Sequence, residues 1–151
     1  MNESTFYNQL PVSLFKNNVD DNSRIFEGFL DIWGIDEAKE EVNIFELKKP
    51  DNYPLGIISE LLFYTLFQRD ILDKKIIYKN IENIKDYRGI KSLINSNCTK
   101  VKGYFLTTKL HPLIDEKLIT FMNFHLKSYD IQLESIKYCV DKEGNIESIN
   151  A

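Results

Sequence analysis

The stretch FEGFLDIWGIDEAKEEVNIFELKKP, residues 26–50, decides the fold of this chain. Its middle, DEAKEE at residues 36–41, is polar and strongly charged, whereas apolar and aromatic residues flank it on both sides. This pattern predicts a β-hairpin in which residues 36–41 form the turn. If residues 36 and 41 face each other across that turn, the same register makes Asp31 and Glu46 cross-strand neighbours.

Three charged residues of this hairpin form a pattern with chemical meaning. Alternation along a strand places Glu46 and Lys48 on one face of the second strand and Phe45 and Leu47 on the other. Like charges opposite each other destabilise a sheet, so a fold that keeps Asp31 opposite Glu46 needs a compensating charge. Lys48 and a divalent cation would both supply it.

A magnesium ion fits this arrangement, because Mg²⁺ prefers one or two carboxylates together with waters and substrate phosphate oxygens. The lysine would then orient or activate the attacking water and stabilise negative charge that develops on the phosphate. Asp31, Glu46 and Lys48 therefore predict a metal-dependent phosphodiesterase.

An ordinary solvated ion cluster on a surface hairpin is the alternative interpretation, since so short a pattern also occurs by chance. The sequence around the charged residues favours the catalytic interpretation. Asp31 lies inside the apolar run Phe29–Trp33, and Glu46 lies between Phe45 and Leu47. A charged residue in such a run is costly unless it has a partner or a function.

The segment after the hairpin, GIISELLFYTLFQRD at residues 56–70, carries apolar residues at helical spacing. The predicted helix, residues 56–72, would pack its apolar stripe on the sheet. Glu60, Tyr64 and Gln68 recur at intervals of four, so they share one face of the helix. We expect that face to look toward the metal, which makes the three residues second-rank candidates for the site.

The order of these elements resembles the PD-(D/E)XK nuclease superfamily, whose members have a restriction-endonuclease-like fold. The resemblance rests on a strand with Asp31, a hairpin, a strand with Glu46-x-Lys48 and a following helix, and it spans residues 9–129. It implies that Asp31 and Glu46 bind Mg²⁺ or Mn²⁺, with the backbone carbonyl of Leu47 as an added ligand. It also implies that Lys48 assists the attacking water.

The helix that follows resembles the Q-x-x-x-Y motif of exonuclease-like members, with Glu60 in place of the Gln and Tyr64 as the Tyr. Two features depart from the family pattern. Residue 30 is Leu where the name of the motif has Pro, and no helix with an acidic residue precedes the first predicted strand. The chain is therefore expected to be an excised domain or a member that lacks the first helix.

Residues 1–151 are expected to form a single α/β domain, a three-layer restriction-endonuclease-like fold with a mixed central sheet flanked by helices. Further strands are predicted within residues 9–15, 101–108 and 131–149, a short helix ends near Asn95, and an amphipathic helix covers residues 111–130. With 43% hydrophobic residues in a chain of 151, one compact core is expected.

The distribution of charge bears on the substrate. The net charge is −4, yet residues 73–109 contain nine basic and three acidic residues, so this segment is basic and the remainder is acidic. Tyr78, Tyr87 and Tyr104 lie among the basic residues, and aromatic rings stack on unpaired nucleobases. The segment is either a surface that faces DNA or an ordinary solvated lysine-rich surface.

These observations together predict an Mg²⁺-dependent endo- or exonuclease with DNA as the favoured substrate. We expect it in the cytoplasm and away from membranes, since no segment resembles a signal peptide or a membrane span. A catalytically inactive nuclease-like module that binds DNA or a protein is the alternative. A homodimer, or a partner chain that completes the site, stays open.

Overall fold

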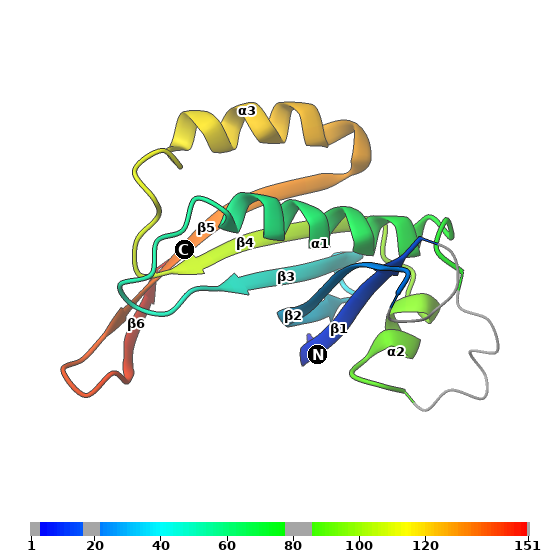
Figure 1. Ribbon diagram of the computed structural model, residues 1–151, viewed down its shortest axis with the longest axis horizontal. Coiled ribbons are helices and arrows are strands. Elements are labelled where there is room, and N and C mark those ends of the chain that lie inside the picture. The colour runs from blue at the N-terminus through cyan, green and yellow to red at the C-terminus, as the bar shows by residue number, and fades with distance from the viewer. Residues whose placement is uncertain (1–3, 17–21, 78–85, 151) are drawn as a thin grey trace.

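The computed structural model describes residues 4–16, 22–77 and 86–150. These residues form an α/β fold on one six-stranded mixed sheet with the order β1-β2-β3-β4-β5-β6 (Figure 1). The strands are β1 (Thr5–Phe15), β2 (Arg24–Asp36), β3 (Glu41–Leu47), β4 (Lys100–Thr107), β5 (Ile131–Val140) and β6 (Ile146–Asn150). The helices are α1 (Ile57–Leu72), α2 (Ile90–Asn95) and α3 (Glu116–Leu126), and a 3-10 turn (Lys127–Tyr129) follows α3.

The hairpin predicted from residues 26–50 is formed by β2 and β3. Asp36 pairs with Glu41 across the charged turn, and the same register continues as far as Ile32 and Phe45. The predicted register is therefore confirmed up to the position next to Asp31. Its continuation would place Asp31 opposite Glu46.

Strands β3, β4 and β5 are parallel, so the chain has to cross over between them. The first crossover contains α1 and α2, and the second contains α3. Figure 1 shows α1 running along β3 and β4. The helix approaches so closely that a Cβ on Gly103 of β4 would lie 2.7 Å from Cγ2 of Thr65 in α1. Glycine at this position thus lets α1 pack on the sheet.

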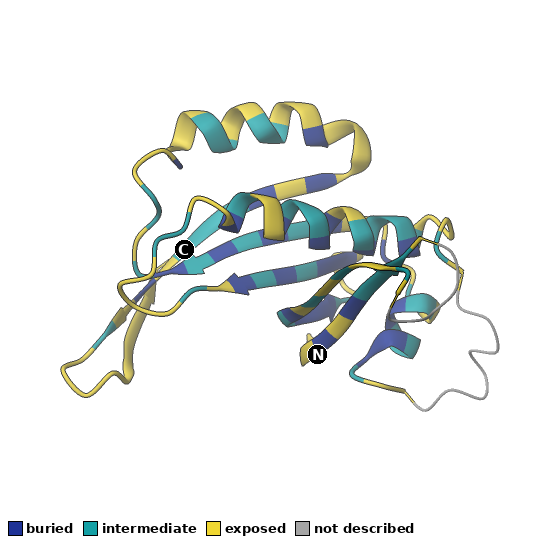
Figure 2. Cartoon of the chain, viewed as in Figure 1, coloured by how far each residue is buried: buried dark blue, intermediate teal, exposed yellow. Residues whose placement is uncertain are grey.

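The face of the sheet beneath α1 carries the core, and Figure 2 shows the buried residues that occur along the strands. Alternate residues on it are fully buried: Val42 and Ile44 in β3, Val101 and Phe105 in β4, and Leu133 in β5. The residues that alternate with these, such as Asn43, Phe45, Lys102 and Tyr104, point to the other face and are partly exposed. Two of these, Phe45 and Tyr104, stack their rings with centroids 4.8 Å apart.

Helix α3 contacts the sheet at the edge of β5. The side-chain Nδ2 of Asn123 donates to the carbonyl of Leu133 at 2.8 Å, and its Oδ1 accepts from the N–H of Leu133 at 2.7 Å. Strand β6 pairs with β5 only from Lys137 to Val140. Asn123 therefore satisfies two backbone groups of β5 where β6 does not reach.

The coarse prediction of an α/β fold with a mixed sheet is confirmed, whereas the restriction-endonuclease-like arrangement and the single domain stay predictions. The helix expected at residues 111–130 is shorter, because Asp115 caps its start by accepting from the N–H of Leu118. In the described residues β1 is the first element. No helix among them is long and apolar enough to cross a membrane.

Candidate active site

Lys48 lies at the centre of the predicted site, directly after β3. Its backbone N–H donates to the carbonyl of Leu106 in β4 at 3.0 Å. Its Nζ lies 2.7 Å from Oε1 of Glu46 and 2.5 Å from Oε2 of Glu60. The ammonium thus joins a carboxylate of the sheet to a carboxylate of α1.

The two carboxylates keep Lys48 charged. Burial by itself would lower the pKa of the amine, but the hydrogen bonds to Glu46 and Glu60 outweigh it and raise the pKa above its usual value. An ammonium donates hydrogen bonds and accepts none. Lys48 is therefore suited to orienting a water or to stabilising negative charge, and not to removing a proton.

Glu46 is the most unusual ionisable group of the site. The residue is only 4% exposed, and its Oε2 is buried without a hydrogen-bond partner in the described structure. Burial raises the pKa of this carboxyl to about 7; Lys48 opposes the rise, while Asp31 and Glu60 add to it. A buried carboxylate oxygen without a partner is costly. A further positive charge beside Oε2 of Glu46 would offset that cost.

Asp31 lies at the end of the β2–β3 ladder and contacts β3 through its side chain. Its Oδ2 accepts from the backbone N–H of Leu47 at 3.2 Å, and its Oδ1 accepts from Nε2 of Gln9 at 3.4 Å. The N–H and the carbonyl of one residue point to the same side of a strand. The carbonyl of Leu47 therefore points toward the side where Asp31 lies, as a shared metal site requires.

Tyr64 lies one turn after Glu60 on α1 and faces β2. A Cβ on Gly28 would be 2.6 Å from the Tyr64 hydroxyl, so the glycine makes room for the phenol. Burial raises the pKa of Tyr64 to about 12, and the nearby carboxylates, Glu46 first, add to the rise. Tyr64 therefore stays a neutral hydrogen-bond donor at the border of the site.

Gln68, the third member of the predicted helix face, is fully buried. Both atoms of its side-chain amide lack a hydrogen-bond partner in the described structure. Among the described residues, neither atom forms a hydrogen bond with Lys48 or with the carboxylates. The helix face thus divides: Glu60 and Tyr64 border the site, and Gln68 lies in the core beyond them.

The donor set is small but fits a hard divalent cation. Within residues 4–16, 22–77 and 86–150, no three side chains of His, Cys, Asp or Glu come together as a metal-binding group. Asp31 and Glu46 supply two carboxylates, the Leu47 carbonyl points to the same region, and Glu46 has an unpaired buried oxygen. One or two carboxylates are what Mg²⁺ takes from a protein that also binds phosphate.

Sequence reasoning missed three residues that support the site. Gln9 reaches Asp31 from β1, and the hydroxyl of Tyr138 in β5 donates to the carbonyl of Lys48 at 2.6 Å. Arg88 donates to the carbonyl of Gln9. Each is far in sequence from the residue that it contacts, so no local spacing could have indicated it.

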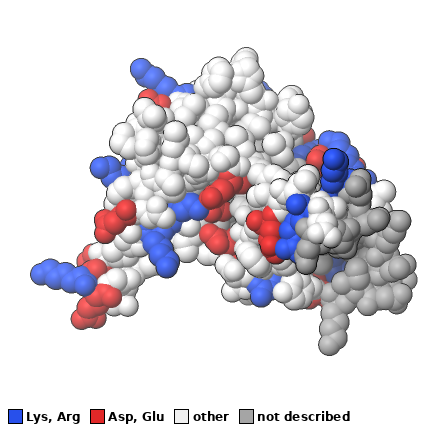
Figure 3. All heavy atoms as spheres, viewed as in Figure 1, with Lys and Arg blue, Asp and Glu red and all other residues white. Residues whose placement is uncertain are grey.

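The basic segment at residues 73–109 does not form an uninterrupted cationic surface in the described residues; Lys79 and Lys85 lie outside them. Lys75 pairs with Asp70 and Asp73, and Lys102 pairs with Glu134. Figure 3 likewise shows small mixed groups of acidic and basic side chains on the face that it draws. Acidic residues thus neutralise part of the positive charge of the segment that the sequence offered as a surface for DNA.

Comparison of the chain with protein-family models, with curated proteins and with solved structures gave no significant match. The function is therefore inferred from the geometry of the site.

Proposed function

We propose that the chain is a metal-dependent nuclease that hydrolyses phosphodiester bonds, with DNA as its favoured substrate. One observation carries the proposal: the buried carboxylate of Glu46 keeps an unpaired oxygen beside Asp31, although Lys48 already contacts its other oxygen. A solvated surface ion cluster, which is the alternative interpretation of the same residues, would not leave a carboxylate oxygen buried and unpaired.

Asp31, Glu46 and the Leu47 carbonyl would hold Mg²⁺ or Mn²⁺. When bound, the ion would polarise the phosphate and lower the pKa of a coordinated water. Lys48 would donate to the attacking water or to a phosphate oxygen, where its fixed charge would stabilise the charge that develops during attack. Glu60 holds Lys48 from the helix side, and Tyr64 offers a neutral hydroxyl at the border of the site.

A cation and an aromatic ring lie at the same end of the sheet as Lys48. The Nζ of Lys109, which follows β4, lies 5.9 Å from the centre of the Tyr53 ring in the loop after β3. A lysine can contact a backbone phosphate, and a tyrosine ring can stack on an unpaired base. This pair supports a nucleic acid as the substrate.

An inactive nuclease-like module is the second candidate function. The observation that favours it is that Lys48 forms ion pairs with both Glu46 and Glu60. The ammonium therefore has two anionic partners without a metal. Such a module would bind DNA or a protein, and Asp31→Ala would leave that binding unchanged.

The test incubates the purified chain with supercoiled and with single-stranded DNA in Mg²⁺ or Mn²⁺, beside an EDTA control. Asp31→Asn, Glu46→Gln and Lys48→Met should abolish cleavage, whereas Glu143→Gln, an exposed carboxylate in the β5–β6 turn, should not. Cleavage that survives Asp31→Asn would refute the proposed site. If the parent protein cleaves no DNA, its affinity for Mn²⁺ decides between the two candidates. Mn²⁺ binding by the parent that is lost in Asp31→Asn indicates a metal site that needs a partner chain. A parent that binds no Mn²⁺ indicates the inactive module.

A further inference from the structure

Strands β1 and β2 pair along nearly their whole length, with an interruption opposite Asp31. Asn8 pairs with Ile32 and Leu10 pairs with Leu30, but the position between them, Gln9 opposite Asp31, is not paired. Gln9 has a φ of 52°, in the left-handed region that a residue with a side chain seldom adopts. Such a conformation persists only where the surrounding structure imposes it.

The interruption changes which residues of β2 face α1. Gly28 faces the Tyr64 hydroxyl of α1, so even-numbered residues point to the helix before the interruption. Trp33 pairs with Ile44, and Ile44 pairs with Gly103, which lies directly under α1. After the interruption, odd-numbered residues therefore point to the helix.

Asp31 lies directly at this change of phase. In an unbroken strand, residues on one face keep the same parity, so a β2 that points Trp33 and Asp31 toward α1 would point Gly28 and Leu30 away from it. With the interruption, Asp31 lies on the face that carries Glu46, while Leu30 stays fully buried. The register with β3 sets the direction of Asp31, and the irregularity lets Leu30 stay in the core beside it.

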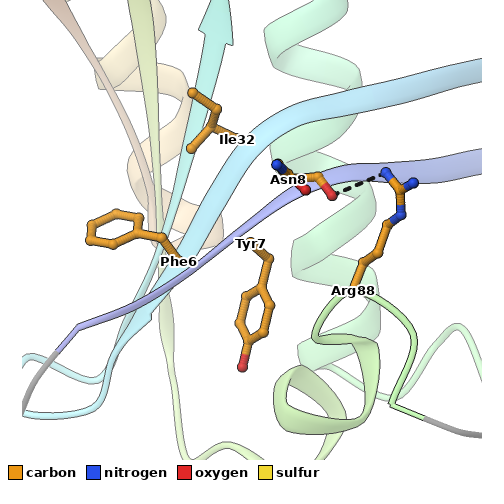
Figure 4. A pocket seen from close by; sticks show the side chains of 5 residues that line it. All are labelled: Phe6, Tyr7, Asn8, Ile32 and Arg88. Atoms are coloured by element: carbon orange, nitrogen blue, oxygen red, sulfur yellow. Dashed lines mark hydrogen bonds between the residues drawn. The ribbon is translucent and has the colours of Figure 1, made fainter.

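Arg88 holds the interrupted backbone. Its Nη1 donates to the carbonyl of Gln9 and, at 3.3 Å, to the carbonyl of Asn8; Figure 4 shows the guanidinium reaching β1 at Asn8. The next residue, Gly89, has a φ of 85°, and a Cβ on it would lie 2.6 Å from the Tyr7 ring. The turn before α2 is thus docked on β1 at the interruption.

Arg88 belongs to the basic segment of the sequence, but its guanidinium binds backbone carbonyls of β1. A guanidinium presents several donors in a fixed plane, which suits it to binding two neighbouring carbonyls at once. A lysine has a single ammonium on a flexible stem and cannot reproduce that arrangement.

We propose that Arg88 is a positioning residue for Asp31: it fixes the left-handed conformation at Gln9, and that conformation lets β1 follow the change of phase in β2, so that Asp31 faces Glu46 while Leu30 stays buried. This inference rests on the proposed function only in treating Asp31 as a metal ligand. The conformational part stands without a metal, because the Leu47 N–H donates to Asp31 in the protein alone.

The test follows hydrogen exchange of the Leu47 amide, with the Ile44 amide of the same strand as the internal reference. Arg88→Gln should accelerate exchange at Leu47 and not at Ile44, and it should weaken Mn²⁺ binding about 10-fold, as is usual when support of a ligand is lost. Arg69→Gln is the matched control, since Arg69 also donates to a backbone carbonyl, that of Thr99, away from the site. It should change neither quantity.

A second variant separates positioning from a general loss of stability. Glycine adopts positive φ readily, and the contact of the Gln9 side chain with Asp31 is a long one at 3.4 Å, so Gln9→Gly added to Arg88→Gln should restore much of the protection of Leu47. If Arg88→Gln does not fold, Arg88→Lys takes its place and should show the same selective change. Leu47 exchange that matches the parent in the Arg88 variant would overturn the inference. A parent that binds no Mn²⁺ would overturn the proposed function instead, and Leu47 exchange would still decide the role of Arg88.

Discussion

Lys48→Met should destabilise the metal-free protein through Glu46. The substitution keeps a long apolar side chain but removes the ammonium 2.7 Å from a carboxylate that is 4% exposed. Breaking a buried ion pair by removing one partner typically costs about 3–5 kcal/mol. Glu46 can escape part of that cost, because its pKa is already raised to about 7 and it can take up a proton.

Protonation sets the size of the effect and its pH dependence. Without Lys48 the pKa of Glu46 rises further, so the carboxyl of the variant stays neutral at pH values where that of the parent protein ionises. The variant then loses about 1.4 kcal/mol of stability for each pH unit above the pKa that Glu46 has in the parent protein. With the lost hydrogen bond added, we expect a loss of about 2 kcal/mol at pH 8. Near pH 6 both proteins keep Glu46 mostly neutral, and the difference should shrink.

The assay is urea denaturation in EDTA at pH 6 and pH 8, read as the free energy of unfolding. Glu46→Gln removes the charge that Lys48 compensates, so Lys48→Met should cost much less on that background. Lys49→Met is the matched control, since Lys49 is exposed one residue further along the chain. A cost of Lys48→Met that is the same at both pH values and with or without Glu46 would refute the reasoning, because the lysine would then act by packing alone.

Three further predictions concern the packing of the helices on the sheet and the tyrosine that borders the site. Gly103→Ala should lower the free energy of unfolding by about 1–3 kcal/mol, since its Cβ would press on Thr65 and Leu133; urea denaturation measures this. Asn123→Ala should cost about 1–3 kcal/mol by leaving both backbone groups of Leu133 without their partner, and hydrogen exchange should show faster opening at Leu133. Because burial raises the pKa of Tyr64 to about 12, its hydroxyl stays protonated at alkaline pH, and Tyr64→Phe should remove no ultraviolet-detected ionisation below pH 11.

Local spacing in the sequence was enough to predict the hairpin and the first long helix. The charged turn set the register that pairs Asp36 with Glu41, and the period of two placed Glu46 and Lys48 on one face. The period of four placed Glu60 and Tyr64 together on α1. These features depend on residues close in the chain, so their geometry follows from the strand and the helix themselves.

Only the tertiary structure decided how these parts meet. The contact of Lys48 with both glutamates needs α1 to pack on β3 and β4, and the pairing of Lys102 with Glu134 needs β4 and β5 to lie side by side. Above all, alternation along β2 from Trp33 would turn Leu30 out of the core. Leu30 stays buried beside Asp31 because the phase of the strands changes there, next to a positive φ at Gln9 whose carbonyl accepts from Arg88, 79 residues further along the chain. A contact between residues so far apart leaves no periodic signal, because the energy that holds it is gained only after the chain has folded.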